Sequence, residues 1–193
     1  MKRRLGKAPL DPLQTLTVIN HQNVQRVKLR LLRWIAWALM LEIRGRKPFD
    51  VGIRLVHIDE ISRLNETFLH HKGATDVITF DYSDGSVDRV RPILHGEIVI
   101  CVEMAIEQAR QFHTAWPCEL VRYIVHGVLH LMRFDDRHTV QRRRMKREED
   151  RLLELLEEQF DFEQLLGTKN ARRTRRTGAV QKLAQIRGRS TSR

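Results

Sequence analysis

Two histidines, His126 and His130, stand four residues apart within an apolar run of the chain. On an α-helix this spacing places both imidazole rings on one face, one turn apart, where they can bind one metal ion. Three further candidate ligands follow shortly afterwards: Asp135, Asp136 and His138. Two histidines and one of these three would leave the fourth position of a tetrahedral metal open, which is typical of a catalytic rather than a structural zinc site.

The segment around the two histidines has the pattern of a helix. Pro117 suits a first helical position and Glu119 suits a first turn. Apolar residues recur at helical spacing, namely Leu120, Ile124, Val128 and Leu131. The alternative interpretation is a pair of ordinary core histidines bonded to the backbone, because H-x-x-x-H is a short pattern. The Asp and His cluster after the helix favours the metal.

Gly127 follows the first histidine, at the position where zinc peptidases of the H-E-x-x-H type carry their general base. A glycine cannot accept a proton from water, so a hydrolase with this helix must rely on the metal to activate water. The sequence therefore disfavours peptide hydrolysis, whose amine leaving group is poor.

Three blocks of sequence carry a resemblance to a known family. They are LNETFLHHKGATDVITF at residues 64–80, HGEIVIC at residues 95–101 and HGVLHLMRFDD at residues 126–136. In this order they are similar to the conserved blocks of the YbeY endoribonucleases, bacterial zinc proteins of ribosomal RNA processing. The resemblance covers roughly residues 50–155 and is too extended for a chance motif match. It implies an α+β fold, a small mixed sheet packed with helices, with one zinc ion.

The resemblance also implies which residues bind the metal. The third histidine of the family falls on Asp136, so the ligands are expected to be His126, His130 and Asp136. Carboxylate oxygen is a sound zinc ligand, and the site can therefore survive the change. His138 is held as the alternative third ligand, because imidazole is a common zinc ligand and loops can adjust.

Two further departures concern the handling of phosphate. Leu69 stands where the family has an arginine that is thought to act on the phosphate. Arg133 stands where the family has a glycine that ends the histidine helix in the left-handed conformation. We expect Arg133 to be a catalytic residue that supplies the charge missing at Leu69. His70 and His71 lie in a loop, where solvated polar residues are the stronger interpretation. His95 and Glu97 flank a strand and could line the groove, and the resemblance makes Glu97 a weak site candidate because the family position is generally acidic.

The positive charge of the chain is concentrated at its C-terminus. The 193 residues carry a net charge of +11, yet residues 167–193 hold nine Lys/Arg and no Asp/Glu. The first 166 residues are therefore nearly balanced, with 26 basic and 24 acidic residues. We predict one YbeY-like domain at 1–166 and a basic, disordered tail at 167–193. The tail is either a solubilising extension or an arm that binds RNA phosphates.

Other features indicate a cytoplasmic protein without membrane segments. The longest apolar stretch, residues 31–43, contains two charges and is too short to span a bilayer, and the start of the chain lacks the apolar region of a signal peptide. Cys101 and Cys118 form no disulfide framework and suit a reducing compartment. We expect strands at 16–20, 51–57, 75–82 and 93–101, and helices at 24–41, 59–70, 102–112 and 140–160, besides the histidine helix.

The leading functional hypothesis is a single-strand-specific, zinc-dependent endoribonuclease. The resemblance implies ribosomal RNA and the ribosome as partners, with roles in maturing the 3′ end of small-subunit ribosomal RNA and in ribosome quality control. One alternative is a ribosome-assembly factor that binds RNA and whose metal is mainly structural, which Leu69 favours slightly. A second alternative is a zinc peptidase, which Gly127 disfavours.

Overall fold

The computed structural model describes residues 14–83 and 93–167. These residues form a four-stranded mixed sheet with five α-helices, so the predicted α+β fold class is confirmed. No helix within the described residues is long and apolar enough to cross a membrane. The predicted tail lies outside the described residues, except for Gly167.

The sheet has the strand order β1-β2-β4-β3. Strands β1, β2 and β4 are parallel, whereas β3 runs antiparallel to β4 and forms one edge of the sheet. The chain passes through the elements in the order β1 (Gln14–Asn20), α1 (Leu29–Arg44), β2 (Phe49–Val56), α2 (Ile58–Leu69), β3 (Val77–Asp81), β4 (Leu94–Cys101), α3 (Val102–Phe112), α4 (Trp116–Leu131), α5 (Thr139–Gln159) and the short 3₁₀ helix η2 (Phe162–Leu165).

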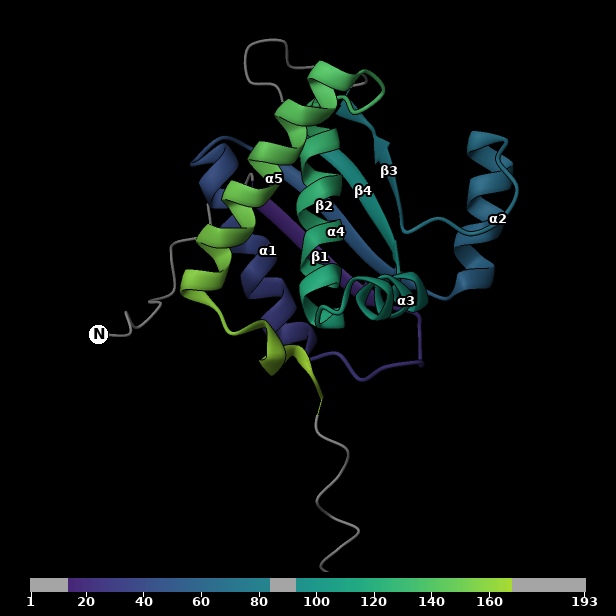
Figure 1. The fold of residues 1–193 in the computed structure, drawn as a ribbon. Coiled ribbons are helices and arrows are strands. Elements are labelled where there is room, and N and C mark those ends of the chain that lie inside the picture. Colours follow the sequence, from purple (N-terminus) through teal and green to yellow (C-terminus); the bar gives the residue numbers. More distant parts are fainter. Residues whose placement is uncertain (1–13, 84–92, 168–193) are drawn as a thin grey trace, which may run out of the picture.

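One face of the sheet carries the main hydrophobic core. Helices α1 and α4 pack on it, and α5 lies against α4 on the side away from the sheet (Figure 1). A smaller cluster on the other face joins β3 and β4 to α2, through residues such as Ile61, Ile78 and Val99. The sheet therefore holds α4 rigidly along one side, while α5 holds it along another.

Gly127 lies where α4 approaches β4 most closely. A Cβ atom on Gly127 would come within 2.5 Å of the Ile98 side chain. Gly96 on the same strand has a similar role, because its Cβ would meet Leu131 at 2.5 Å. Since real Cβ contacts are not so short, both glycines allow the histidine helix to pack directly on the sheet.

The largest error in the expected elements is the start of the first helix. The apolar spacing from Val24 predicted a helix from that residue, but α1 begins at Leu29. Val27 instead pairs with Leu166, and the Gly167 amide donates a hydrogen bond to the Arg26 carbonyl at 2.8 Å. These long-range contacts outweigh the local helical pattern, as tertiary contacts often do.

Candidate metal centre

Helix α4 places His126 and His130 on one face, as their spacing predicts. The helix starts with Pro117 in its first turn, where a missing N–H is tolerated. It ends near Arg133, whose φ of 65° lies in the left-handed region. Arg133 is thus the left-handed residue that ends the helix, although it is not a glycine. It turns the chain into the loop of residues 132–138, called here the metal loop.

Three candidate ligand atoms meet at the end of α4. The Nε2 atoms of His126 and His130 lie 3.0 Å apart, and each lies 4.0 Å from Oδ2 of Asp136. All three side chains are partly buried, with 27%, 30% and 43% of their areas exposed. These residues form the one group of three or more possible metal ligands within the part of the chain that the structure describes.

The hydrogen bonds of the two histidines fit a bound cation. Nδ1 of His126 lies 3.0 Å from a carboxylate oxygen of Glu149, and Nδ1 of His130 lies 3.2 Å from the Phe134 carbonyl. Both partners are acceptors only, so each Nδ1 carries the proton and each Nε2 of a neutral ring presents a lone pair. Two lone pairs 3.0 Å apart repel each other unless a cation lies between them. Tetrahedral zinc would separate two nitrogen ligands by about 3.3 Å, which is close to this distance.

Glu149 is a buried carboxylate on α5 that orients His126. Its second oxygen accepts hydrogen bonds from Arg122 at 3.0 Å and from Lys146 at 2.8 Å. Burial opposes ionisation of Glu149, but the His126 ring and the Lys146 ammonium group outweigh it, and its pKa falls to about 2. A carboxylate behind a histidine ligand fixes the tautomer and the direction of the ring, which metal sites commonly require.

The second histidine is kept neutral by its surroundings. Burial lowers the pKa of His130, and the positive charge of a protonated His126 lowers it further. The carboxylate of Asp136 acts in the opposite direction without reversing the shift. A neutral imidazole is the form that binds metal, so this environment favours the ligand form of the ring.

Arginines engage three successive residues of the metal loop. Arg144 on α5 lies 5.5 Å from the centre of the Phe134 ring, and Arg142 donates to the Asp136 carbonyl at 2.8 Å. Within the loop, Arg137 binds both oxygens of Asp135 at 3.0 to 3.1 Å. These hydrogen bonds lower the pKa of Asp135 to about 2 and occupy its carboxylate. Asp135 is therefore a poor candidate for the third ligand.

Arg133, the predicted catalytic residue, forms an ion pair with Asp81 at the end of β3. Nη2 of Arg133 lies 3.0 Å from Oδ2 of Asp81, and 62% of the arginine side chain is exposed. Leu69, at the position of the family arginine, is the last residue of α2 and is 47% exposed. Neither residue belongs to the group of possible metal ligands.

The weaker candidates lie away from the three ligands. His138 is exposed at the N-cap of α5, and its side chain is not part of the ligand group. His70 and His71 are exposed after α2. His95 and Glu97 project from the sheet face opposite α4, where His95 lies 3.8 Å from Asp50 and Glu97 lies 3.0 Å from Arg54. Both free cysteines are also outside the site, Cys101 buried and Cys118 half-buried.

Sequence reasoning missed Glu149, although the sequence holds a signal for it. Glu149 lies in the helix expected at residues 140–160, from which no site residue was predicted. However, it falls on the buried stripe of α5 between Met145 and Leu152. A carboxylate on an apolar stripe needs a buried partner, and His126 is such a partner.

Comparisons with known proteins identify the family of the chain. The family model described as Endoribonuclease YbeY matches residues 17–157. Proteins named Endoribonuclease YbeY from Parabacteroides distasonis and Chlorobium luteolum are 33% and 39% identical to the chain, over 61% of it and 79% and 81% of their own lengths. The relative of that name from Chlorobium phaeovibrioides is 30% identical over 73% of the chain and 91% of its own.

A solved structure shows the same fold. The solution structure of TM1509 from Thermotoga maritima has a TM-score of 0.53 and 24% identity, covering 74% of this chain and 89% of its own. This likeness concerns the fold alone. The family match, in contrast, spans both histidines, Asp136 and Glu149. The chain therefore belongs to the endoribonuclease YbeY family.

Proposed function

We propose that this protein is a zinc-dependent endoribonuclease that cuts single-stranded RNA. The observation that carries the proposal is the convergence of His126, His130 and Asp136, with both Nδ1 atoms held by acceptors. One bound zinc ion would supply Lewis acidity, which polarises a phosphodiester and makes water a better nucleophile near neutral pH. Two histidines and one carboxylate leave room for a fourth, non-protein ligand.

The residues of the chain have separate roles in this proposal. Glu149 and the Phe134 carbonyl orient the two imidazoles, while Asp136 brings a negative charge that offsets the charge of the metal. Arg133 is proposed to bind the scissile phosphate in place of the arginine absent at Leu69. Because 62% of the Arg133 side chain is exposed, against 21% of Asp81, a phosphate can reach the guanidinium group from solvent and compete with Asp81 for it.

The substrate assignment follows the name of the relatives and the charge around the site. The relatives are called endoribonucleases. The first half of α5 is rich in arginine, which suits a polyanionic substrate. We propose ribosomal RNA as the substrate, with roles at the 3′ end of small-subunit RNA and in ribosome quality control. This substrate places the protein on the ribosome, in the cytoplasm.

The test is metal-dependent cleavage. Purified full-length protein, stripped of metal and then supplied with zinc or left without it, is incubated with single-stranded RNA, duplex RNA and a peptide library. We expect zinc-dependent cutting of single-stranded RNA alone. The His126→Ala protein is the matched inactive control, and equal cutting by this variant would show that a contaminating nuclease is responsible.

A second candidate function is an RNA-binding factor of ribosome assembly whose metal is structural. The observation that favours it is Leu69, an exposed apolar side chain at the position of an expected phosphate-binding arginine. In the same experiment, zinc-independent binding without cutting would support this second function. Peptide cleavage would support a zinc peptidase.

A further inference from the structure

Helix α5 carries opposite charges in its two halves. Residues 142–147 contain five Lys/Arg and no acid, whereas residues 148–159 contain six Asp/Glu and one Arg. The first turn has no acidic residue and the last turn has no basic residue. This order opposes the helix macrodipole, which favours acids at the N-terminus and bases at the C-terminus. The charge order therefore does not serve the stability of the helix, and another role must account for it.

Two arginines in the basic half, Arg143 and Arg147, have no side-chain partner among the residues that the structure describes. Both are exposed, and they lie one turn apart on the face opposite the buried stripe of Met145 and Glu149. Within residues 14–83 and 93–167, neither forms a hydrogen bond, an ion pair or a cation–π contact. The other three basic residues of this half are engaged, Arg142 and Arg144 with the metal loop and Lys146 with Glu149.

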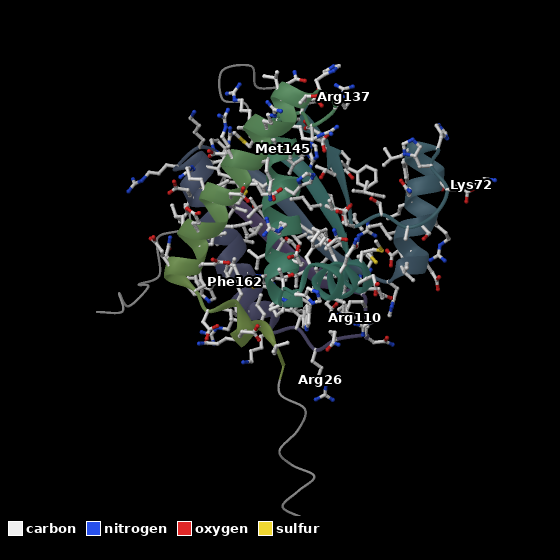
Figure 2. All side chains as sticks on the ribbon, in the orientation of Figure 1. Arg26, Lys72, Arg110, Arg137, Met145 and Phe162 are labelled. Carbon is white, nitrogen blue, oxygen red and sulfur yellow. The ribbon has the colours of Figure 1, made fainter. Side chains whose placement is uncertain are left out.

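These contacts place the first half of α5 beside the metal centre, with Arg143 and Arg147 on the side of the helix that is turned away from Glu149. Arg143 follows Arg142, which holds the carbonyl of the ligand Asp136. Arg147 follows Lys146, which binds the carboxylate that orients His126. In Figure 2, Arg137 of the metal loop and Met145 lie toward one end of the molecule, and Arg26 lies at the opposite end.

We propose that Arg143 and Arg147 bind backbone phosphates of single-stranded RNA where the strand extends from the metal centre across the exposed face of α5, an inference that rests on the proposed function. A guanidinium group binds phosphate in a bidentate manner and stays charged at all relevant pH values. Contacts to phosphate position a strand without selecting its sequence. The acidic second half of α5 repels the same backbone, which confines the strand to the end of the helix that carries the metal loop.

The test compares two full-length double variants, Arg143→Gln/Arg147→Gln and Arg30→Gln/Arg33→Gln. The second is a matched control, because both of its arginines are exposed, form no hydrogen bond or ion pair within the described residues, and lie near the start of another helix, α1. Binding of a fluorescent single-stranded oligoribonucleotide is measured at several salt concentrations, with metal removed by a chelator so that no cleavage occurs.

The α5 variant should bind RNA about tenfold more weakly at ~0.1 M salt, and the slope of log K against log salt should fall by about 1.4, since each single-strand phosphate contact contributes about 0.7. The control should change neither quantity. An unchanged slope in the α5 variant, or an equal loss in the control, would overturn the proposal.

Thermal unfolding distinguishes this role from a structural one. Removing two positive charges from the N-terminal half of α5 should leave Tm unchanged or raise it by about 1–3 °C, while RNA binding falls. A lower Tm would indicate that the arginines hold the fold and would count against the proposal. If the slope differs between the wild type and the α5 variant but the zinc-loaded wild type does not cut RNA, the proposed activity is overturned and this site stands.

Discussion

The two sides of the metal centre are built in different ways. On the helix side, His126 is held by Glu149, a buried carboxylate with two further cationic partners. On the loop side, His130 is held by the Phe134 carbonyl, and Asp136 is 43% exposed. On the helix side, a buried carboxylate and its cationic partners fix the position of His126. On the loop side, the positions of His130 and Asp136 depend on the backbone conformation of the loop and on surface arginines. We therefore expect His126 to keep its position with and without a metal, and the loop side to adjust when a metal binds.

The largest effect should come from loss of Asp136, the proposed ligand on the loop side. Asp136→Ala should weaken zinc binding by more than 100-fold, because it removes a ligand rather than a supporting group. His138→Ala is the matched control and should bind zinc as the wild type does. Both affinities are measured by competition with a chromogenic chelator. If only the His138 variant loses zinc, the assignment of Asp136 as ligand is wrong.

Loss of Glu149, which supports His126 on the helix side, should weaken zinc binding less than loss of Asp136. Glu149→Gln should weaken zinc binding about 10- to 100-fold, as expected for a carboxylate behind a histidine ligand. Glu148→Gln is the control, because Glu148 neighbours Glu149 but pairs with Arg151 on the surface. Equal zinc affinities for the two variants would remove the distinction between the two sides.

The two sides should also respond to different pH ranges in the metal-free protein. Burial of His130 lowers its folded pKa, so the stability linked to it is present above about pH 6.5 and is lost as the pH falls through the lower folded value. Glu149 has an ordinary pKa of 4.5 and a folded pKa of about 2, so its contribution, roughly 3 kcal/mol, is lost as the pH falls from 4.5 to 2.

Urea unfolding of metal-free protein at a series of pH values measures both changes. In the Glu149→Gln variant the decline below pH 4.5 should shrink, while the earlier decline linked to His130 should persist. An earlier decline that also disappears would show that the two sides titrate as one unit.

The smallest effect on the fold should come from Arg133. Its φ of 65° costs a non-glycine residue about 1 kcal/mol, which Arg133→Gly would recover, partly offset by loss of the ion pair with the partly buried Asp81 carboxylate. RNA cleavage should nevertheless fall. Arg133→Lys keeps the charge and the strain, and should retain more activity. Equal or higher activity in the glycine variant would show that the arginine is incidental.

The sequence predicted those parts of the site that depend on local spacing. His126 and His130 share a helical face because they are four residues apart, and Arg133 takes the left-handed conformation because the chain must leave the helix there. The contacts of Glu149 depend on how α5 lies against α4, which no local pattern fixes. The same holds for α1, whose expected first turn was displaced by pairing of Val27 with Leu166.

The fit of Gly127 against Ile98 limits what this scaffold can become. A zinc peptidase needs a glutamate after its first histidine, and a single substitution would appear sufficient to introduce one. Here that position faces β4, and even a methyl group would overlap Ile98. The incoming carboxylate would be forced into the core rather than toward the metal, and the helix would have to move off the sheet. Conversion to a peptidase would therefore require the helix, the strand and the ligand geometry to change together. No single substitution links this scaffold to peptide hydrolysis.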